Sequence, residues 1–288
     1  MAQSWLQLSV RTRAAHLDAA SNFLIERGSP GIVVKRNGLN AFFPVNHNAS
    51  ALKKEVQRFF AALDRLSSSA GTAELDWKVV RGENWNTSWK RFIKARRVGK
   101  TFWVTPPWLA PPKFRRRQVI IIEPGMAFGT GTHATTRGCL EFLELATGRL
   151  NRGQFTALDV GTGSGILAIA LVKLGARKVW AIDNDPVALQ VARENLKANG
   201  TTRRVHLSGT NLRSIRKTFS LTVANLTADT ILELADSIGK KVAAKGYLVL
   251  SGILRQKSRA VISRFGGKFR TVKRKKSPEW VTLLLQHR

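Results

Sequence analysis

The sequence contains little cysteine, no long apolar run and few acidic residues, and each shortage excludes a class of protein. Its single cysteine, Cys139, cannot form an intrachain disulfide or a multi-cysteine metal site, which favours a reducing compartment. No apolar stretch reaches the roughly 18 residues that a membrane-spanning helix needs. The N-terminus lacks the basic and apolar regions of a signal peptide. We therefore expect a cytoplasmic protein with no metal site and no membrane contact.

The shortage of acidic residues leaves a strong positive charge. The 288 residues include 48 Lys and Arg against 18 Asp and Glu, so the net charge is +30, and the excess occurs in both halves of the chain. Such a charge favours anionic partners, above all ribosomal RNA, whereas basic residues scattered over solvated faces would give the same total. Basic clusters lie at residues 113–117 and 273–276, and neither alternates with aromatic side chains as a platform for single-stranded bases does.

The most informative segment of the chain is the glycine-rich turn within residues 157–165. An apolar strand leads into Gly-Thr-Gly-Ser-Gly, a helical pattern follows, and a second buried strand ends at Asp183. A strand–turn–helix–strand unit of this kind binds a nucleoside at the carboxyl edge of a parallel sheet. A dinucleotide fingerprint that began at Gly161 and Gly163 would need a third glycine where Ile166 stands. The spacing G-x-G-x-G is instead typical of S-adenosylmethionine-dependent methyltransferases.

The residue types of this segment suit that cofactor. Without a Cβ, the backbone at Gly161 and Gly163 can approach a ligand closely and adopt positive φ. The two oxygens of Asp183 can accept hydrogen bonds from both ribose hydroxyls. An ordinary tight turn followed by a solvated aspartate is the alternative interpretation, and the acid at the end of the next strand makes it the weaker one.

The first part of the chain has the pattern of a separate small domain. Residues 1–82 show the strand–helix–strand–strand–helix–strand order of a ferredoxin-like α+β domain. The expected strands are residues 5–10, 31–35, 39–44 and 75–80, and the expected helices are residues 14–27 and 51–66. Residues 83–117 are rich in tryptophan, proline and basic side chains, and we expect them to form a semi-rigid linker.

Residues 118–288 alternate strands with helices, which requires a doubly wound, mostly parallel sheet. The expected strands are residues 119–122, 157–160, 179–182, 205–207, 221–224 and 247–251, and the expected helices include residues 166–174, 186–199 and 228–244. Residues 269–273 and 280–285 are expected to close the sheet as a hairpin with an antiparallel last strand. This seven-stranded α/β layout fits a class I S-adenosylmethionine-dependent methyltransferase better than a dinucleotide-binding fold.

The loop before the first strand of that sheet is rich in glycine and threonine. Residues 123–136 contain no P-loop spacing, and we expect them to fold over a bound cofactor, with the hydroxyl of Thr136 donating to it. The alternative is an entry loop whose threonines only begin the next helix. His133 invites a catalytic interpretation, but no histidine or cysteine cluster accompanies it. We interpret it as a loop-stabilising residue.

The fourth strand is predicted to place Asn225 at its carboxyl end, where a methyl donor meets its acceptor. Enzymes that methylate base nitrogens usually carry [DN]-P-P-[YF] there, and this chain has neither the prolines nor the aromatic ring. The carbonyl oxygen of Asn225 could hold an aliphatic amine, cap the next helix, or do both. Residues 209–212, where adenine usually lies, contain no acid, so the adenine contact stays unassigned.

Several segments together resemble the PrmA family of ribosomal protein methyltransferases. They are residues 124–136, 158–169, 181–186, 223–226 and 251–254, with the tryptophan-bearing segments 83–90 and 279–281. The resemblance spans the whole chain. It implies an N-terminal domain that binds the substrate, ribosomal protein L-eleven of the large subunit, and brings it to the catalytic domain. It also implies repeated methylation of lysine ε-amines and an N-terminal α-amine, with cofactor contacts at Thr136, Gly161, Asp183 and Asn225.

Two other functions compete with this one. The positive charge favours an RNA methyltransferase, and the segment that follows Asn225 disfavours it. A basic ribosome-associated protein could also keep a methyltransferase fold without activity, but the intact glycines and Asp183 argue against that loss.

Overall fold

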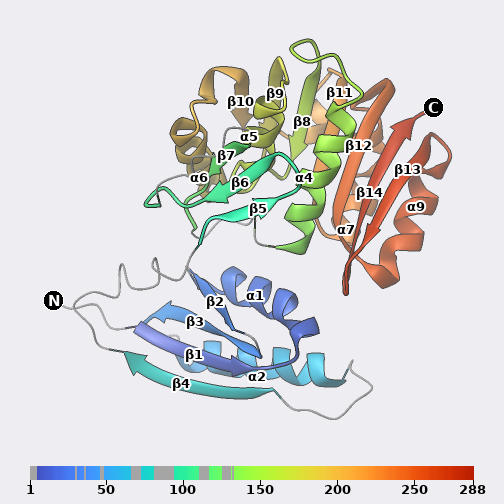
Figure 1. The fold of residues 1–288 in the computed structure, drawn as a ribbon. Coiled ribbons are helices and arrows are strands. Elements are labelled where there is room, and N and C mark those ends of the chain that lie inside the picture. Colours follow the sequence, from blue (N-terminus) through green and yellow to red (C-terminus); the bar gives the residue numbers. More distant parts are fainter. Residues whose placement is uncertain are drawn as a thin grey trace. The chain divides into compact units, whose positions relative to one another are not determined.

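A computed structural model of the chain describes residues 5–29, 31–35, 37–45, 49–65, 73–80, 94–109, 117–124, 131 and 133–288. The chain divides into two compact units (Figure 1). The N-terminal unit comprises Met1–Lys94 with Pro124–Phe128, and the C-terminal unit comprises Ala95–Glu123 with Gly129–Arg288. Among the described helices, none is long and apolar enough to cross a membrane.

The N-terminal unit is a four-stranded antiparallel sheet in the order β2-β3-β1-β4, as in a ferredoxin-like fold. Its elements are β1 (Trp5–Arg11), a 3-10 turn (Ala14–His16), α1 (Leu17–Glu26), β2 (Ile32–Lys35), β3 (Gly38–Pro44), α2 (Ala49–Arg65) and β4 (Glu74–Val80). Alternate apolar residues of β1, such as Leu8, pack with Leu24 of α1 and Phe60 of α2. Both helices therefore cover one face of the sheet, and the expected element order is confirmed.

The C-terminal unit is built on a seven-stranded sheet in the order β10-β9-β8-β11-β12-β14-β13. The strands are β8 (Thr156–Val160), β9 (Lys178–Ile182), β10 (Val205–Ser208), β11 (Phe219–Asn225), β12 (Val242–Leu254), β13 (Phe269–Lys276) and β14 (Trp280–His287). Neighbouring strands pair in parallel from β10 to β12, and β14 pairs antiparallel with both β12 and β13. The doubly wound sheet with its closing hairpin is confirmed.

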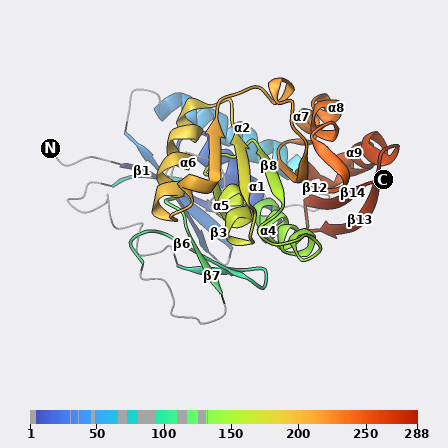
Figure 2. The same ribbon diagram turned by 90° about the horizontal axis from the view of Figure 1, so that it is seen from above.

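Helices cover both faces of this sheet, and each face has its own apolar core (Figure 2). One face packs against α4 (Ala134–Thr147), α5 (Ile166–Lys173) and α6 (Pro186–Ala198), and the other against α7 (Ala228–Glu233), α8 (Ala235–Gly239) and α9 (Ser258–Gly266). Since α5 is buried at Ile166 through Val172, it forms the centre of the first core. The strands beneath are apolar on both sides, as a sheet covered on both faces requires.

The expected linker differs most from the structure. Its described residues include β5 (Arg96–Val98) and β6 (Phe102–Thr105), which form a three-stranded sheet with β7 (Gln118–Ile121). Phe102 and Val104 are buried in the same core as α4 and α5. The described part of the expected linker from Ala95 onward therefore belongs to the C-terminal unit, and the strand expected at residues 119–122 pairs with β6 outside the seven-stranded sheet.

The single helix expected at residues 228–244 is wrong. The structure has two short helices, α7 and α8, and the chain is already extended at Val242, where it pairs with Phe219 of β11. The buried Lys241 explains the early end, since its ammonium donates to the Ile215 carbonyl oxygen and its own carbonyl oxygen accepts from the Phe219 amide. These long-range contacts outweigh the helical pattern of the sequence.

Candidate active site

The glycine-rich turn lies at the carboxyl end of β8 and is bonded to the end of β9. The amides of Gly161 and Thr162 both donate to the Ile182 carbonyl oxygen, at 2.9 and 3.0 Å. All three glycines of the turn, Gly161, Gly163 and Gly165, have positive φ, at 71°, 53° and 80°. A Cβ on Gly161 would lie 2.4 Å from the Leu226 side chain. Glycine is therefore favoured where the turn meets Leu226, because its φ is positive and an added Cβ would require the Leu226 side chain to shift.

Replacing Gly161 with alanine is expected to lower the free energy of unfolding by about 2 kcal/mol or more, because positive φ and the clash with Leu226 add together. Urea unfolding would measure the loss. Gly153→Ala is the matched control, since Gly153 has a φ of 79° but nothing within 4 Å of the added Cβ. Equal losses in the two variants would show that close packing against Leu226 contributes nothing.

Asp183 lies directly after β9 and is fixed by two backbone amides. The Gly163 amide donates to its Oδ2 at 2.9 Å, and the Asp185 amide donates to its Oδ1 at 3.1 Å. Each carboxylate oxygen keeps lone pairs for a further donor. The structure thus joins the turn and the acid, as the sequence predicted, and leaves a carboxylate that can accept from a pair of ribose hydroxyls.

A second carboxylate, Asp159, lies buried beneath the turn, and the sequence analysis gave it no role. Its Oδ2 accepts from the Thr162 hydroxyl at 2.7 Å, while its buried Oδ1 has no partner among the described residues. Burial raises the pKa of Asp159 to about 7; the hydrogen bond from Thr162 opposes this rise and the Asp183 carboxylate adds to it. An acid within an otherwise apolar strand was the signal that could have revealed it.

Asp159 should make stability depend on pH. The unfolded chain loses this proton near pH ~4 and the folded chain near pH 7, so between them the folded state holds one more proton. The contribution of Asp159 to the free energy of unfolding therefore falls by up to about 1.4 kcal/mol per pH unit as the pH rises through that window. Above the window this contribution no longer changes with pH. Asp159→Asn should remove this fall in urea unfolding of the cofactor-free protein, whereas Asp185→Asn should not. An unchanged pH profile in Asp159→Asn would contradict the raised pKa.

Asn225 ends β11 and faces the first turn of α4. Its Nδ2 lies 3.5 Å from the hydroxyl oxygen of the fully buried Thr136, to which it donates. Its Oδ1 is buried and has no partner among the described residues. The next helix, α7, is capped instead by Thr227, whose hydroxyl accepts from the Thr230 amide at 3.3 Å. The capping interpretation of Asn225 is therefore wrong, and its carbonyl oxygen lacks a donor among the described residues.

Hydroxyl groups that the sequence analysis did not single out hold α4 against the sheet. The Ser251 hydroxyl lies 3.2 Å from the Thr135 carbonyl oxygen and 2.8 Å from the Thr282 hydroxyl. His133 caps α4, since its ring nitrogen accepts from the Thr135 amide, and its ring packs edge-on against Trp280. His133 therefore holds the start of α4, and its expected role in stabilising the preceding loop stays a prediction.

Asn195 of α6 connects the glycine-rich turn to the segment after β7. Its Nδ2 donates to the Ser164 carbonyl oxygen at 2.9 Å, and its Oδ1 accepts from the Glu123 amide at 3.0 Å. Both the nitrogen and the oxygen of this buried amide thus position backbone groups. Its partners lie far away in the sequence, so no local pattern revealed it.

Two predicted features of the site, the glycine- and threonine-rich loop and the adenine segment, stay predictions. Most of the glycine- and threonine-rich loop, residues 125–130 and 132, lies outside the described residues. In the segment expected to meet adenine, the Asn211 side chain accepts from the Arg213 amide at 2.9 Å and so caps a short turn. No group of three or more side chains able to hold a metal lies in the described part of the chain.

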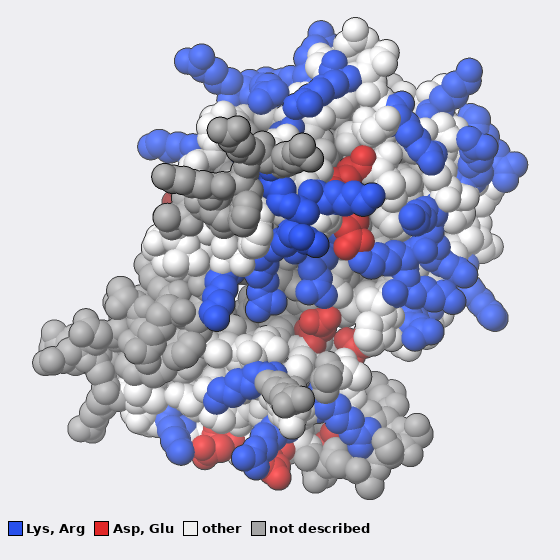
Figure 3. Space-filling view, in the orientation of Figure 1, with Lys and Arg blue, Asp and Glu red and all other residues white. Residues whose placement is uncertain are grey.

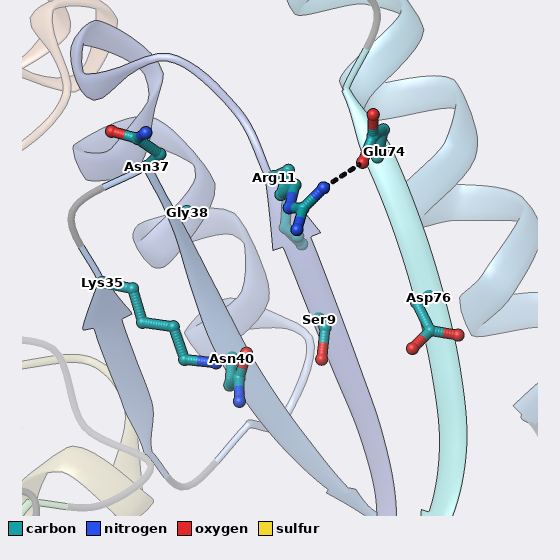
Figure 4. Close-up of a pocket in the computed structure, with 9 residues that line it drawn as sticks. Ser9, Arg11, Lys35, Asn37, Gly38, Asn40, Glu74 and Asp76 are labelled. Carbon is teal, nitrogen blue, oxygen red and sulfur yellow. Dashed lines mark hydrogen bonds and ion pairs between the residues drawn. The ribbon is translucent and has the colours of Figure 1, made fainter.

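The N-terminal unit has a groove of about 640 Å³ on the open face of its sheet, opposite the two helices (Figure 4). Arg11 of β1 donates to Glu74 of β4 at 3.3 Å, and Asp76 lies next along the same face of β4. Lys35 lines the groove from β2. Charges of both signs on an exposed face suit a polar protein surface better than an apolar ligand.

Comparison with known proteins gives one consistent family. The family model described as "Ribosomal protein L11 methyltransferase (PrmA)" matches residues 4–288. The chain is 35% identical to the ribosomal protein L11 methyltransferase of Pelobacter propionicus, over 99% of this chain and 98% of that protein. It is 36% identical to the protein of the same name from Geobacter sulfurreducens, over 92% of each.

A solved structure supports the same relationship. The crystal structure of a ribosomal protein L11 methylase from Lactobacillus delbrueckii subsp. bulgaricus superposes with a TM-score of 0.62 at 29% sequence identity. The superposition covers 68% of this chain and all of that one.

Proposed function

Because this chain belongs to the ribosomal protein L11 methyltransferase (PrmA) family and is an S-adenosylmethionine-dependent protein methyltransferase, we propose that Asn225 holds the acceptor amine of ribosomal protein L11. The amines concerned are lysine ε-amines and the N-terminal α-amine. The single observation that carries the assignment is the buried, unpartnered Oδ1 of Asn225. An amine N–H is the donor that this oxygen lacks, and a buried acceptor without a donor costs free energy.

Thr136 supports this role by fixing the orientation of the amide. Since the Asn225 Nδ2 donates to the Thr136 hydroxyl, Oδ1 is the atom left for the acceptor. A hydrogen bond from the amine to Oδ1 would orient the nitrogen lone pair for an in-line reaction. The sulfonium of S-adenosylmethionine supplies a methyl group that is already activated, so no covalent intermediate on the protein is required.

The acceptor must lose a proton before it can react. A free lysine ε-amine has a pKa of about 10.4 and is mostly protonated at pH 7. Burial beside Asn225, away from water, lowers the pKa of the amine and favours its neutral form. The amide oxygen of Asn225 can accept a hydrogen bond from the neutral amine. Because this oxygen carries no net charge, it stabilises the protonated amine less than a carboxylate would.

The cofactor would be held by the residues around the glycine-rich turn. Asp183 would accept from the ribose hydroxyls, the backbone at Gly161 and Gly163 would approach the ligand, and Thr136 would donate from α4. The fit rests on observed features: the glycines of the turn have positive φ, and Asp183 is already aligned by two amides. The partnerless Oδ1 of Asp159 beneath the turn is a further acceptor for a ligand donor or water.

We assign substrate recognition to the ferredoxin-like domain at residues 1–82 and catalysis to residues 118–288. The N-terminal unit has its own core and its own groove of mixed charge, which supports a separate binding role. A ribosomal protein substrate supports a cytoplasmic location for the enzyme. The net charge of +30 supports contact with ribosomal RNA as a further part of the proposal.

The proposal is tested by incubating the protein with labelled S-adenosylmethionine and an unmethylated ribosomal extract. Label on one small protein of the large subunit is expected, on its lysines and its α-amine. Label that survives protease but not ribonuclease would identify an RNA methyltransferase instead. No transfer despite cofactor binding would favour the binding role without activity.

A further inference from the structure

Strand β12 contains a bulge near its carboxyl end. Between two regular pairs with β14, Ser251 and Gly252 together oppose the single residue Thr282, and Gly252 has a φ of 81°. The bulge changes the face that the strand presents. Val249 packs in the core beside α4, whereas Ile253, four residues further on, packs in the opposite core. Bulges are common next to active sites, where they re-aim a side chain.

The side chain of Ser251 holds the first turn of α4. Ser251 is fully buried, and its hydroxyl lies 3.2 Å from the Thr135 carbonyl oxygen and 2.8 Å from the Thr282 hydroxyl. A hydroxyl has one proton and a carbonyl oxygen can only accept, so Ser251 donates to Thr135 and Thr282 donates to Ser251. The Thr135 carbonyl belongs to the peptide that joins Thr135 to Thr136. Ser251 therefore holds the backbone at Thr136.

The backbone of Ser251 holds the end of β11. Ser251 lies opposite Asn225 in the parallel pairing of β12 with β11, and its carbonyl oxygen accepts from the Leu226 amide at 3.1 Å. That amide belongs to the peptide that joins Asn225 to Leu226. One residue thus holds the backbone at both Thr136 and Asn225, whose side chains meet where the Asn225 Nδ2 lies 3.5 Å from the Thr136 hydroxyl oxygen.

Gly252 lets the backbone after Asn225 come close to the bulge. A Cβ added to Gly252 would lie 2.8 Å from the carbonyl carbon of Leu226 and closer still to its oxygen. Because these are backbone atoms, no change of rotamer could move them away, and the chain that follows Asn225 would have to shift. The positive φ of Gly252 also favours glycine at this position.

We propose that Ser251 and Gly252 are positioning residues for methyl transfer. The bulge sets the end of β11 against α4, and so fixes the direction in which the Asn225 carbonyl oxygen meets the acceptor amine. This inference rests on the proposed role of Asn225, through which both residues act. A misplacement of about 1 Å in a reacting group can lower a rate by about 100-fold, so the loss of one of the two bonds made by Ser251 is expected to lower it by about 10-fold.

A purely structural role is the competing explanation. The bulge turns Ile253 into its core, and a hydrogen bond from a buried hydroxyl stabilises the fold wherever it occurs. On this explanation, replacing Ser251 lowers stability but leaves the rate of the folded enzyme unchanged. The proposal predicts instead that the rate falls, and that it falls only while the Asn225 side chain is present.

The test measures single-turnover methylation of L11 at saturating S-adenosylmethionine by Ser251→Ala, by Asn225→Ala and by the double variant. Ser251→Ala alone should lower the rate by about 10-fold. In the double variant it should lower the rate of Asn225→Ala by less than about twofold, because the amide through which it acts is gone. Ser258→Ala is the matched control, since its buried serine hydroxyl also donates to a backbone carbonyl oxygen, that of Arg255 at 2.7 Å. It should leave the rate unchanged.

A second variant tests the other residue of the bulge. Gly252→Ala should lower the rate at least as much as Ser251→Ala, whereas Gly200→Ala should not, since Gly200 has a φ of 64° and nothing within 4 Å of the added Cβ. Urea unfolding shows whether each variant is folded in the assay. None of these substitutions changes a charge, so the Lys and Arg side chains spread over the face in Figure 3 are the same in every variant.

Two outcomes would overturn the positioning role and leave the proposed function standing. In the first, Asn225→Ala lowers the rate but folded Ser251→Ala does not. In the second, the two losses multiply in the double variant, which would show that Ser251 does not act through Asn225. If Asn225→Ala itself keeps the full rate, the proposed role of Asn225 fails, and the positioning role fails with it.

Discussion

Asp183→Ala is expected to lower the affinity for S-adenosylmethionine by at least about 100-fold, because two hydrogen bonds to a charged acceptor are each worth about 1.5–3 kcal/mol. The loss has a second part. Asp183 also accepts from the Gly163 amide at 2.9 Å, so its removal releases the turn that faces the cofactor. Calorimetric titration of the cofactor into the purified variant measures both parts together.

Asp185→Ala is the matched control for this change. Asp185 lies two residues away and caps α6 by accepting from the Val187 amide, with no bond to the glycine-rich turn. It should cost about 1 kcal/mol of stability and leave cofactor affinity nearly unchanged. If Asp183→Ala binds the cofactor as the unaltered protein does, the site assignment is wrong.

Asn225→Ala is expected to reduce kcat by about 100-fold while cofactor affinity changes little. The amide positions the acceptor nitrogen, and a small misplacement of a reacting atom costs rate rather than binding. Single-turnover methylation of L11 at saturating cofactor, together with a cofactor titration, separates the two quantities.

Asn211→Ala is the matched control for Asn225→Ala, because Asn211 is also an asparagine near the carboxyl end of a strand of the seven-stranded sheet. Asn211 only caps the short turn after β10, so its replacement should leave kcat unchanged. A parallel drop in kcat and cofactor affinity in Asn225→Ala would mean that Asn225 serves the cofactor alone.

The part of the site formed by residues close together in the sequence was predictable. The contacts between residues far apart in the sequence were not. The turn at Gly161 and Gly163 and the acid at Asp183 lie within one strand–turn–helix–strand unit, whose spacing is visible in the chain. The contact between Thr136 and Asn225 joins residues 89 positions apart, and that between Ser251 and Thr135 joins residues 116 positions apart. Such contacts depend on the strand order, which spacing alone does not reveal.

The fold likewise contains elements that the sequence pattern located and elements that it did not. Strands with continuous apolar runs were located to within a few residues, since burial on both faces leaves a plain pattern. β5 and β6 were missed because they are three and four residues long and lie in a segment rich in proline. The early end of α8 depends on the buried Lys241, which donates to the Ile215 carbonyl oxygen 26 positions earlier, and the neighbours of Lys241 in the sequence do not indicate that partner.

The position of β14 between β12 and β13 has a consequence for how the sheet assembles. β13 pairs with β14 alone, and a tight turn closed by the Ser277 amide on the Trp280 carbonyl oxygen joins the two strands. A hairpin with so short a connection forms within microseconds, whereas the parallel pairs of the sheet must first close crossovers through helices. The hairpin is therefore expected to fold first and to dock on β12 as a preformed unit. It would then already carry the exposed basic side chains of β13 when the partly folded chain is most prone to aggregate.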